Sequence, residues 1–192
     1  MSDFVFSVDK DSGLISPARL LSSPNRDERP AGTAVSLLLV HGISLPPGEF
    51  GTGAIEALFL NELDFDAHPY YAEIRGLEVS SHLLIDRSGR VTQFVSFNER
   101  AWHAGESFFR GRTRCNDFAI GVELEGTDTT PYTDAQYAAL VGVTTAIISA
   151  YPEVGARTIA AHSDVAPGRK TDPGPAFDWQ RLYDGVVDNL NA

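Results

Sequence analysis

A short apolar run at residues 36–40 constrains the fold of this 192-residue chain more than any other feature. It reads Ser36-Leu37-Leu38-Leu39-Val40 and is followed at once by His41-Gly42. A run of this length that stops at turn-forming residues is typical of a central strand buried on both faces. Such a strand needs packed layers on both sides of its sheet. The run therefore favours a layered fold over a bundle of helices.

Further strand and helix signals alternate along the chain. Strands are predicted at 81–86, 91–95, 119–124 and 158–161. Helices are predicted at 55–63, 134–150 and 179–190, the second after the capping box Thr133-Asp134-Ala135-Gln136. We expect loops at 64–80, 96–117 and 165–175. This interleaving predicts an α/β fold with a central mixed sheet flanked by helices. Residues 36–192 are expected to form one domain, with residues 1–35 an extended N-terminal lead-in packed on it.

The charge and cysteine content exclude several classes of function. With 15 basic and 26 acidic residues, the formal net charge is −11, which argues against a nucleic-acid partner. No run of 18 apolar residues and no targeting segment is visible, so we expect a cytoplasmic protein without a membrane partner. No obligate protein partner is evident. The single cysteine, Cys115, excludes a disulfide framework and a cysteine-cluster metal site. A metal site would have to use histidine and carboxylate ligands.

Two histidines occupy equivalent places at the ends of predicted strands. His41 and His162 each follow a short apolar run and begin a loop containing glycine or proline. Asp172 comes ten residues after His162, in a short, proline-rich loop with little conformational freedom. Two imidazoles and one carboxylate can bind zinc and leave its fourth position open, which is the catalytic arrangement. Spacing alone favours three unrelated polar residues over a metal site, because this pattern is weak without a framework, so both interpretations stay open at this point.

Lys170 and Glu123 are candidates for catalytic groups beside such a metal. In an extended segment Lys170 and Asp172 point the same way, so the ammonium can stabilise a developing oxyanion; a solvated loop lysine is the alternative. Glu123 lies among apolar residues, where a carboxylate is seldom buried without a function or a partner. We expect it to act as a general base whose pKa is raised by burial.

Two further residues of the 119–125 segment share a face with Glu123. Gly121 has no side chain, so we expect it to let a substrate or a metal approach the strand. Glu125 is interpreted as a surface or capping carboxylate.

Aromatic and basic residues elsewhere offer substrate contacts. Tyr70, in the turn His68-Pro69-Tyr70-Tyr71, is expected to form part of a substrate-side wall. Trp102 can stack on a sugar ring or equally anchor its loop by packing. Arg114, with Arg110 and Arg112, can hold a substrate carboxylate or lie in solvent. His82, within an apolar strand, is interpreted as a hydrogen-bonded core residue.

Four segments carry a resemblance to a known family. They read LLLVHGISLPPGEFG, DAHPYYAEIRGLEVSSHLLIDRSG, RAWHAGESFFRGRTRCNDFAIGVELEGTD and AHSDVAPGRKTDPGPAFDW. In this order, over roughly residues 14–183, the chain resembles the cytoplasmic AmpD-type N-acetylmuramoyl-L-alanine amidases, which are zinc amidases of cell-wall recycling. The resemblance implies a fold similar to peptidoglycan recognition proteins and phage-type amidase lysozymes.

The resemblance also implies a chemistry. His41, His162 and Asp172 would bind one zinc ion per chain, Glu123 would be the general acid and base, and Lys170 would stabilise the tetrahedral intermediate. The implied substrate is a small molecule, a 1,6-anhydro-N-acetylmuramoyl peptide. The implied bond lies between the lactyl group of the sugar and L-alanine.

The sequence departs from the family pattern at two positions. Gly42 stands where many relatives have an asparagine, and Glu78 stands where relatives often carry an arginine that helps to bind the stem-peptide carboxylate. Arg75 is near enough in sequence to replace that arginine, and Arg114 matches its family counterpart. Two alternatives remain. One is a muropeptide-binding protein without catalysis, which typically lacks a zinc ligand, and the other is an exported amidase acting on intact peptidoglycan.

Overall fold

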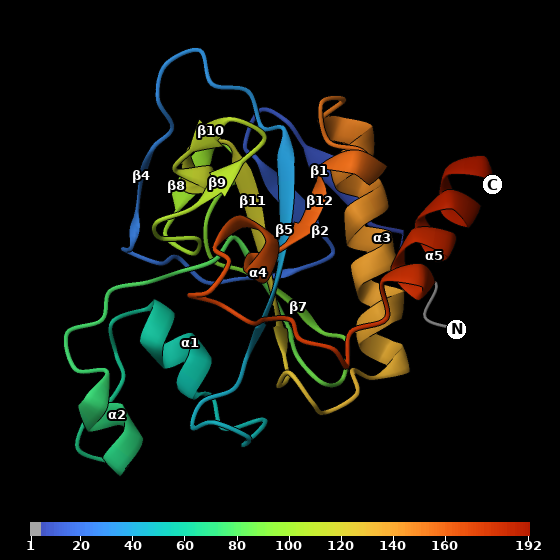
Figure 1. Cartoon of the computed structure of the whole chain (residues 1–192). Helices are drawn as coiled ribbons and strands as arrows, with labels where there is room; N and C mark the ends of the chain where they lie inside the picture. Colours follow the sequence, from blue (N-terminus) through green and yellow to red (C-terminus); the bar gives the residue numbers. More distant parts are fainter. Residues whose placement is uncertain (1–4) are drawn as a thin grey trace.

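The predicted central strand forms β5 (Leu37–Ile43), whose first five residues are buried. β5 pairs in parallel with β11 (Ala119–Glu125) on one side and with β12 (Ile159–Ala161) on the other. In this computed structural model, which describes residues 5–192, these three strands lie within a six-stranded sheet (Figure 1). The central position explains the continuous apolar run, because β5 is covered on both faces.

The other half of the sheet makes it mixed. β6 (Leu83–Ile85) runs parallel to β11 and antiparallel to β7 (Val91–Gln93), and β3 (Arg19–Leu20) closes the edge parallel to β7. The strand order is β12-β5-β11-β6-β7-β3. The predicted mixed α/β fold is thereby confirmed.

Two long helices cover one face of the sheet. α3 (Asp134–Ala150) and α5 (Trp179–Asn191) lie side by side (Figure 1). α3 begins at the predicted capping box, where the Thr133 hydroxyl accepts from the Gln136 amide and the Gln136 side chain accepts from the Thr133 amide. Its apolar side chains pack on β5, β6 and β11 to form the main core. No helix within residues 5–192 is long and apolar enough to cross a membrane.

The remaining elements are short, and of these β1 packs against α3. The helices are α1 (Ala54–Phe59), α2 (Pro69–Glu73) and α4 (His162–Val165). The small strands are β1 (Ser7–Asp9), β2 (Leu14–Ser16), β4 (Arg26–Glu28), β8 (Glu99–Ala101), β9 (Phe108–Phe109) and β10 (Arg112–Thr113). Two 3₁₀ turns are η1 (Cys115–Asp117) and η2 (Ala156–Thr158). The segments 5–35 and 96–117, in which we expected no regular structure, therefore contain short strands that pair antiparallel as β1–β2, β4–β8 and β9–β10.

The register of β5 and β11 decides where the polar side chains of the strands lie. Leu38 and Val40 of β5 pack in the core beneath α3, so His41 lies on the opposite face of the sheet. In the parallel pairing, His41 is the direct partner of Glu123 on β11. Two residues far apart in sequence therefore lie side by side at the end of adjacent central strands, where α/β folds often carry their sites.

Candidate active site

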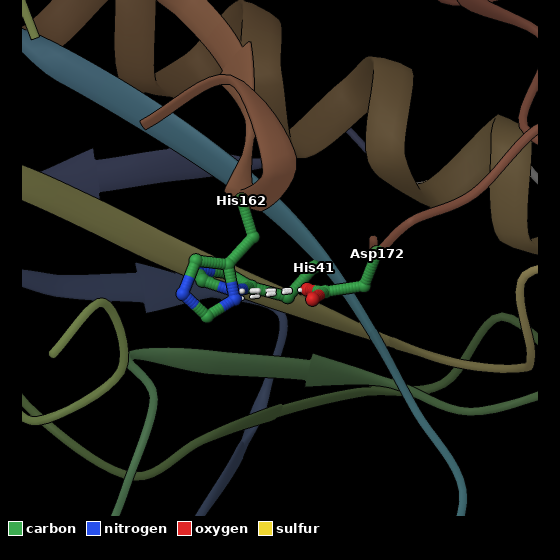
Figure 2. Close-up of side chains that lie close together, drawn as sticks. All are labelled: His41, His162 and Asp172. Atoms are coloured by element: carbon green, nitrogen blue, oxygen red, sulfur yellow. Dashed lines mark hydrogen bonds and ion pairs between the residues drawn. The ribbon is translucent and has the colours of Figure 1, made fainter. Parts of the chain in front are cut away.

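Two histidines and an aspartate from three segments converge at the end of the central strands. Figure 2 shows the imidazoles of His41, from β5, and His162, the first residue of α4, directed at the carboxylate of Asp172. The Asp172 Oδ2 atom lies 3.3 Å from His41 Nδ1 and 3.1 Å from His162 Nδ1. One possible ligand atom from each residue lies within 4.8 Å of the others. The three predicted residues are thus brought together.

Burial and mutual contact perturb the acid–base behaviour of this cluster. Burial lowers the pKa of His41 to about 4, although its hydrogen bond with Asp172 acts in the other direction. Burial would raise the pKa of Asp172, but hydrogen bonds from His162 and His41 outweigh it and hold that pKa below its usual value. These shifts favour a neutral His41 imidazole beside an ionised Asp172 carboxylate, which are the protonation states that metal ligands need.

The donor geometry fits a metal ion of zinc size. Zinc binds nitrogen and oxygen at about 2.0–2.2 Å, so tetrahedral ligand atoms lie about 3.3–3.6 Å apart. The separations of 3.3 and 3.1 Å between Asp172 and the two histidines come close to that spacing. The donor set of two imidazoles and one carboxylate is also one that zinc accepts. The cluster is therefore compatible with a metal site.

A buried carboxyl group, that of Glu123, lies beside the cluster. Glu123 is 8% exposed, and its Oε1 lies 3.9 Å from His41 Nδ1. Its Oε2 is buried and has no hydrogen-bond partner among residues 5–192. Burial, and secondly the charge of Asp172, raise the pKa of Glu123 well above its ordinary value, while the Lys170 ammonium opposes the shift. A carboxyl held in this state is suited to exchange protons with a reacting group.

Lys170 lies at the edge of the same site. It is exposed, and its backbone amide donates to Ala166 at the end of α4. Its ammonium disfavours protonation of His41 and favours ionisation of Glu123, so the charge acts on both groups. That Lys170 and Asp172 face the same point stays a prediction.

Of two expectations for β11, the one for Gly121 proves wrong, and the one for Glu125 as a surface or capping carboxylate holds only in its second half. Gly121 does not leave an open approach to the strand, because the ring of His103 fills the space: a Cβ at Gly121 would lie 2.6 Å from it. Glu125 is buried rather than on the surface, at 5% exposure. Its carboxylate accepts from the backbone amides of Gly51 (2.5 Å) and Arg87 (3.2 Å). Glu125 therefore fixes the loop after β5 and the turn after β6, which border the site.

His82 forms hydrogen bonds within the core, in line with the sequence interpretation. It is fully buried, and its Nδ1 accepts from the Gly121 amide at 3.0 Å. Its Nε2 lies 3.1 Å from the carbonyl of Glu99 and 3.1 Å from Arg29 Nη2. Burial and the neighbouring Arg29 charge lower the pKa of His82 well below its ordinary value, so the ring is neutral.

The residues predicted to contact substrate come from three separate segments of the chain. Tyr70 lies on α2, which Figure 1 places at the periphery beyond α1 and apart from α4. Trp102 is half-buried, and its indole nitrogen is buried with no hydrogen-bond partner among the described residues. Arg114 is exposed and lies 3.4 Å from Asp117. Among the described residues, no hydrogen bond or ion pair joins these three side chains to His41, His162 or Asp172, and their substrate contacts stay predictions.

The arginines near Arg114 and near Glu78 have partners of their own. The guanidinium of Arg110 lies 5.3 Å from the ring of Phe109, and that of Arg112 lies 3.7 Å from the ring of Phe118. Arg75, considered as a replacement for the family arginine, pairs with Asp66 at 2.5 Å.

Sequence reasoning missed Tyr132, which supports the loop that carries Asp172. This tyrosine is 5% exposed, and its hydroxyl donates to the Pro173 carbonyl at 3.0 Å. A Cβ at Gly42 would collide with the same hydroxyl. The only signal in the sequence was the glycine beside His41, and the sequence does not show that Tyr132 packs against it.

Comparisons with known proteins agree with this geometry. The family model described as N-acetylmuramoyl-L-alanine amidase matches residues 32–175. The 1,6-anhydro-N-acetylmuramyl-L-alanine amidase AmpD of Enterobacter cloacae is 58% identical over 173 residues, which cover 90% of this chain and 92% of that protein.

Solved structures of amidases are also similar to this chain. A crystal structure of an AmpD derivative superposes with a TM-score of 0.90 at 54% identity, covering 93% of this chain and 98% of that one. The Escherichia coli amidase AmiD, solved with anhydro-N-acetylmuramic acid-L-Ala-D-gamma-Glu-L-Lys, gives a TM-score of 0.59 at 30% identity, covering 94% of this chain and 65% of that one. Sequence, fold and site geometry together show that the chain belongs to the N-acetylmuramoyl-L-alanine amidase family of hydrolases.

Proposed function

We propose that this protein is a zinc-dependent amidase that cleaves 1,6-anhydro-N-acetylmuramoyl peptides between the lactyl group of the sugar and L-alanine. One observation carries the proposal: the ligand atoms of His41, His162 and Asp172 converge beside Glu123, whose buried Oε2 has no hydrogen-bond partner among residues 5–192. The substrate class is supported by the name of the Enterobacter cloacae relative and by the ligand of the AmiD structure.

The metal would be held by His41, His162 and Asp172. Zinc bound by such a set lowers the pKa of a coordinated water to about 7 and polarises a carbonyl oxygen. The Nδ1 atoms of both histidines face the Asp172 carboxylate, so the cluster directs three donors to one point. Because the imidazoles are 1–4% exposed at the side chain, these donors are held within the packed protein.

Glu123 would move the proton in this reaction. Its Oε2 makes no competing hydrogen bond among the described residues and is free to accept a proton from the attacking water. The raised pKa lets the same carboxyl keep that proton and donate it to the amine of L-alanine as the C–N bond breaks. General acid–base catalysis of this kind contributes about 10²–10⁴-fold.

Lys170 would stabilise the negative charge that develops on the amide carbonyl oxygen. Its ammonium already acts electrostatically on His41 and Glu123, so it lies within range of the reacting centre. A fixed positive charge at this place lowers the barrier because it interacts more strongly with the oxyanion than with the neutral carbonyl.

The proposal is tested with purified protein and a defined anhydromuropeptide. Mass spectrometry should detect free anhydro-N-acetylmuramic acid and the released peptide, and the metal content should be one zinc per chain. Glu123→Gln should keep the zinc and lose about 10²–10⁴-fold in kcat, whereas His41→Ala should lose the zinc. Binding of the muropeptide without cleavage by zinc-loaded protein would instead show a non-catalytic binding protein. Full turnover in chelator-treated protein would refute zinc dependence.

We further propose that the enzyme acts on free anhydromuropeptides in the cytoplasm, in peptidoglycan recycling. Support comes from the 1,6-anhydro substrate named for the relatives, which is a fragment rather than an intact polymer. The test compares kcat/KM for the anhydromuropeptide with that for polymeric peptidoglycan, and locates the protein by cell fractionation. Preference for the polymer, or recovery outside the cytoplasm, would favour an exported amidase.

A further inference from the structure

A loop that the proposed chemistry does not use lies behind the two histidines of the cluster. It contains the segment Trp102-His103-Ala104-Gly105. His103 Nδ1 lies 2.9 Å from His41 Nε2, and the carbonyl oxygen of Ala104 lies 3.2 Å from His162 Nε2. Two consecutive residues of one loop thus contact the outer nitrogens of both imidazoles, while their inner nitrogens face Asp172.

These contacts bear on the tautomer of each histidine. When Nδ1 of His162 gives its lone pair to a metal, the ring hydrogen lies on Nε2, and the Ala104 carbonyl, which can only accept, is placed 3.2 Å away to receive it. His41 presents a lone pair at Nδ1 when its own Nε2 carries the hydrogen. In that state the group facing Nε2, which is His103 Nδ1, must be the acceptor.

The ring of His103 is held in place on several sides. The Asn116 side-chain oxygen accepts from the backbone amides of His103 (3.2 Å) and Ala104 (2.8 Å). The ring packs against the backbone of Gly121, where any Cβ would displace it. It also lies edge-on to His82, with ring centroids 5.6 Å apart.

The environment of the other ring nitrogen of His103 indicates that this residue does more than stabilise the fold. Its Nε2 is buried and has no hydrogen-bond partner among residues 5–192. A buried polar group without a partner costs about 1–3 kcal/mol. An apolar side chain of similar size would avoid that cost, so the contact with His41 is the feature that requires a histidine here.

We propose that His103 is a positioning residue for the metal site, accepting the Nε2 hydrogen of His41 and so directing the His41 Nδ1 lone pair at the metal. The proposal rests on the proposed function, since it requires that His41 binds zinc. Groups that hydrogen-bond to metal ligands typically change metal affinity 10–100-fold when removed. His103 would act on zinc through His41, without touching the metal or the substrate.

A matched pair of variants tests this proposal. His103→Asn keeps an acceptor oxygen close to the place of Nδ1, whereas His103→Leu has a similar size and shape but no acceptor. The zinc dissociation constant is measured by competition with a chromophoric chelator, and urea unfolding of the metal-free proteins reports the fold. We expect zinc affinity to fall 10–100-fold in His103→Leu and to stay within about threefold of wild type in His103→Asn.

The outcomes separate the positioning role from a packing role. Equal zinc affinity in the two variants, whether both retained or both lost, would overturn the proposal. If His103→Leu does not fold, His103→Ala takes its place, and the same ordering against His103→Asn is expected. Wild-type protein that binds no zinc would refute the proposed function itself. Wild-type zinc binding that His103→Leu leaves unchanged would refute only the positioning role.

Discussion

The guanidinium of Arg29 links the N-terminal segment to the loop behind the active site, and its removal should weaken the fold measurably. Its nitrogens donate to four backbone carbonyls at 2.9–3.2 Å, those of Phe97, Asn116, Asp117 and Ala119. Burial lowers the pKa of Arg29 to about 10, so the group remains charged at neutral pH. Three of the four acceptors lie at the end of the 96–117 loop or at the start of β11, which carries Glu123.

The magnitude follows from these contacts. A hydrogen bond from a charged donor contributes about 1.5–3 kcal/mol, and four such bonds would contribute about 6–12 kcal/mol if they were independent. The four bonds come from one side chain, so their contributions do not simply add. Arg29 is also only half-buried, so in the variant water can donate to some of the carbonyls that lose the guanidinium. For Arg29→Met, which keeps most of the aliphatic stem, we expect a loss of about 2–4 kcal/mol. In a chain of this length, that loss lowers Tm by roughly 4–16 °C.

Urea unfolding followed by circular dichroism measures this loss at a fixed zinc concentration. Arg90→Met is the matched control, because the Arg90 side chain is 65% exposed and pairs with Asp86 on the surface. We expect the control to lose less than about 1 kcal/mol. A loss below about 1 kcal/mol in Arg29→Met, or equal losses in the two variants, would refute the reasoning that Arg29 holds this region together.

Three further predictions concern the residues around the site. Tyr132→Phe removes the buried hydrogen bond to Pro173 and should cost about 1–2 kcal/mol in urea unfolding; no change would show that water replaces the hydroxyl. Thr133→Ala removes the cap of α3 and should cost about 1 kcal/mol, whereas Thr133→Ser should cost less; equal losses would argue against the capping hydroxyl. Burial and a neighbouring guanidinium depress the pKa of His82, so the unfolded chain takes up a proton near pH 6.5 that the folded chain does not. Stability is therefore fully present above pH 6.5 and falls on acidification. His82→Gln should reduce the stability lost between pH 7.5 and 5.5 by about 1 kcal/mol, and an unchanged pH profile would contradict the assignment.

The long, strongly patterned elements were predictable because their signals are local. The apolar run at 36–40 became β5, and the helix predicted at 134–150 begins at its capping box and has those same bounds. The helix predicted at 179–190 ends one residue later. The short strands at 5–35 and 96–117 were missed, because two- and three-residue strands gain their stability from partners far away in the sequence.

The residues of the site also divide into those that the sequence predicted and those that it did not. Residue type and position at strand ends, together with the family resemblance, were enough to select His41, His162, Asp172, Glu123 and Lys170. The sequence could not show that Glu125 is buried. Its carboxylate can be buried only because two backbone amides from distant segments, those of Gly51 and Arg87, donate to it. Nor could it separate His103 from an ordinary loop residue.

What the sequence determined by itself is the α/β class, the main strands and helices, and the identity of the chemical groups at the strand ends. The tertiary structure alone decided which of those groups meet. The parallel register of β5 with β11 sets His41 beside Glu123, and the 102–105 loop sets His103 behind His41. The physical reason is that strand and helix propensities depend on neighbours within a few residues. The direction of a lone pair or the burial of a carboxyl depends on chain segments that come together only when the core packs.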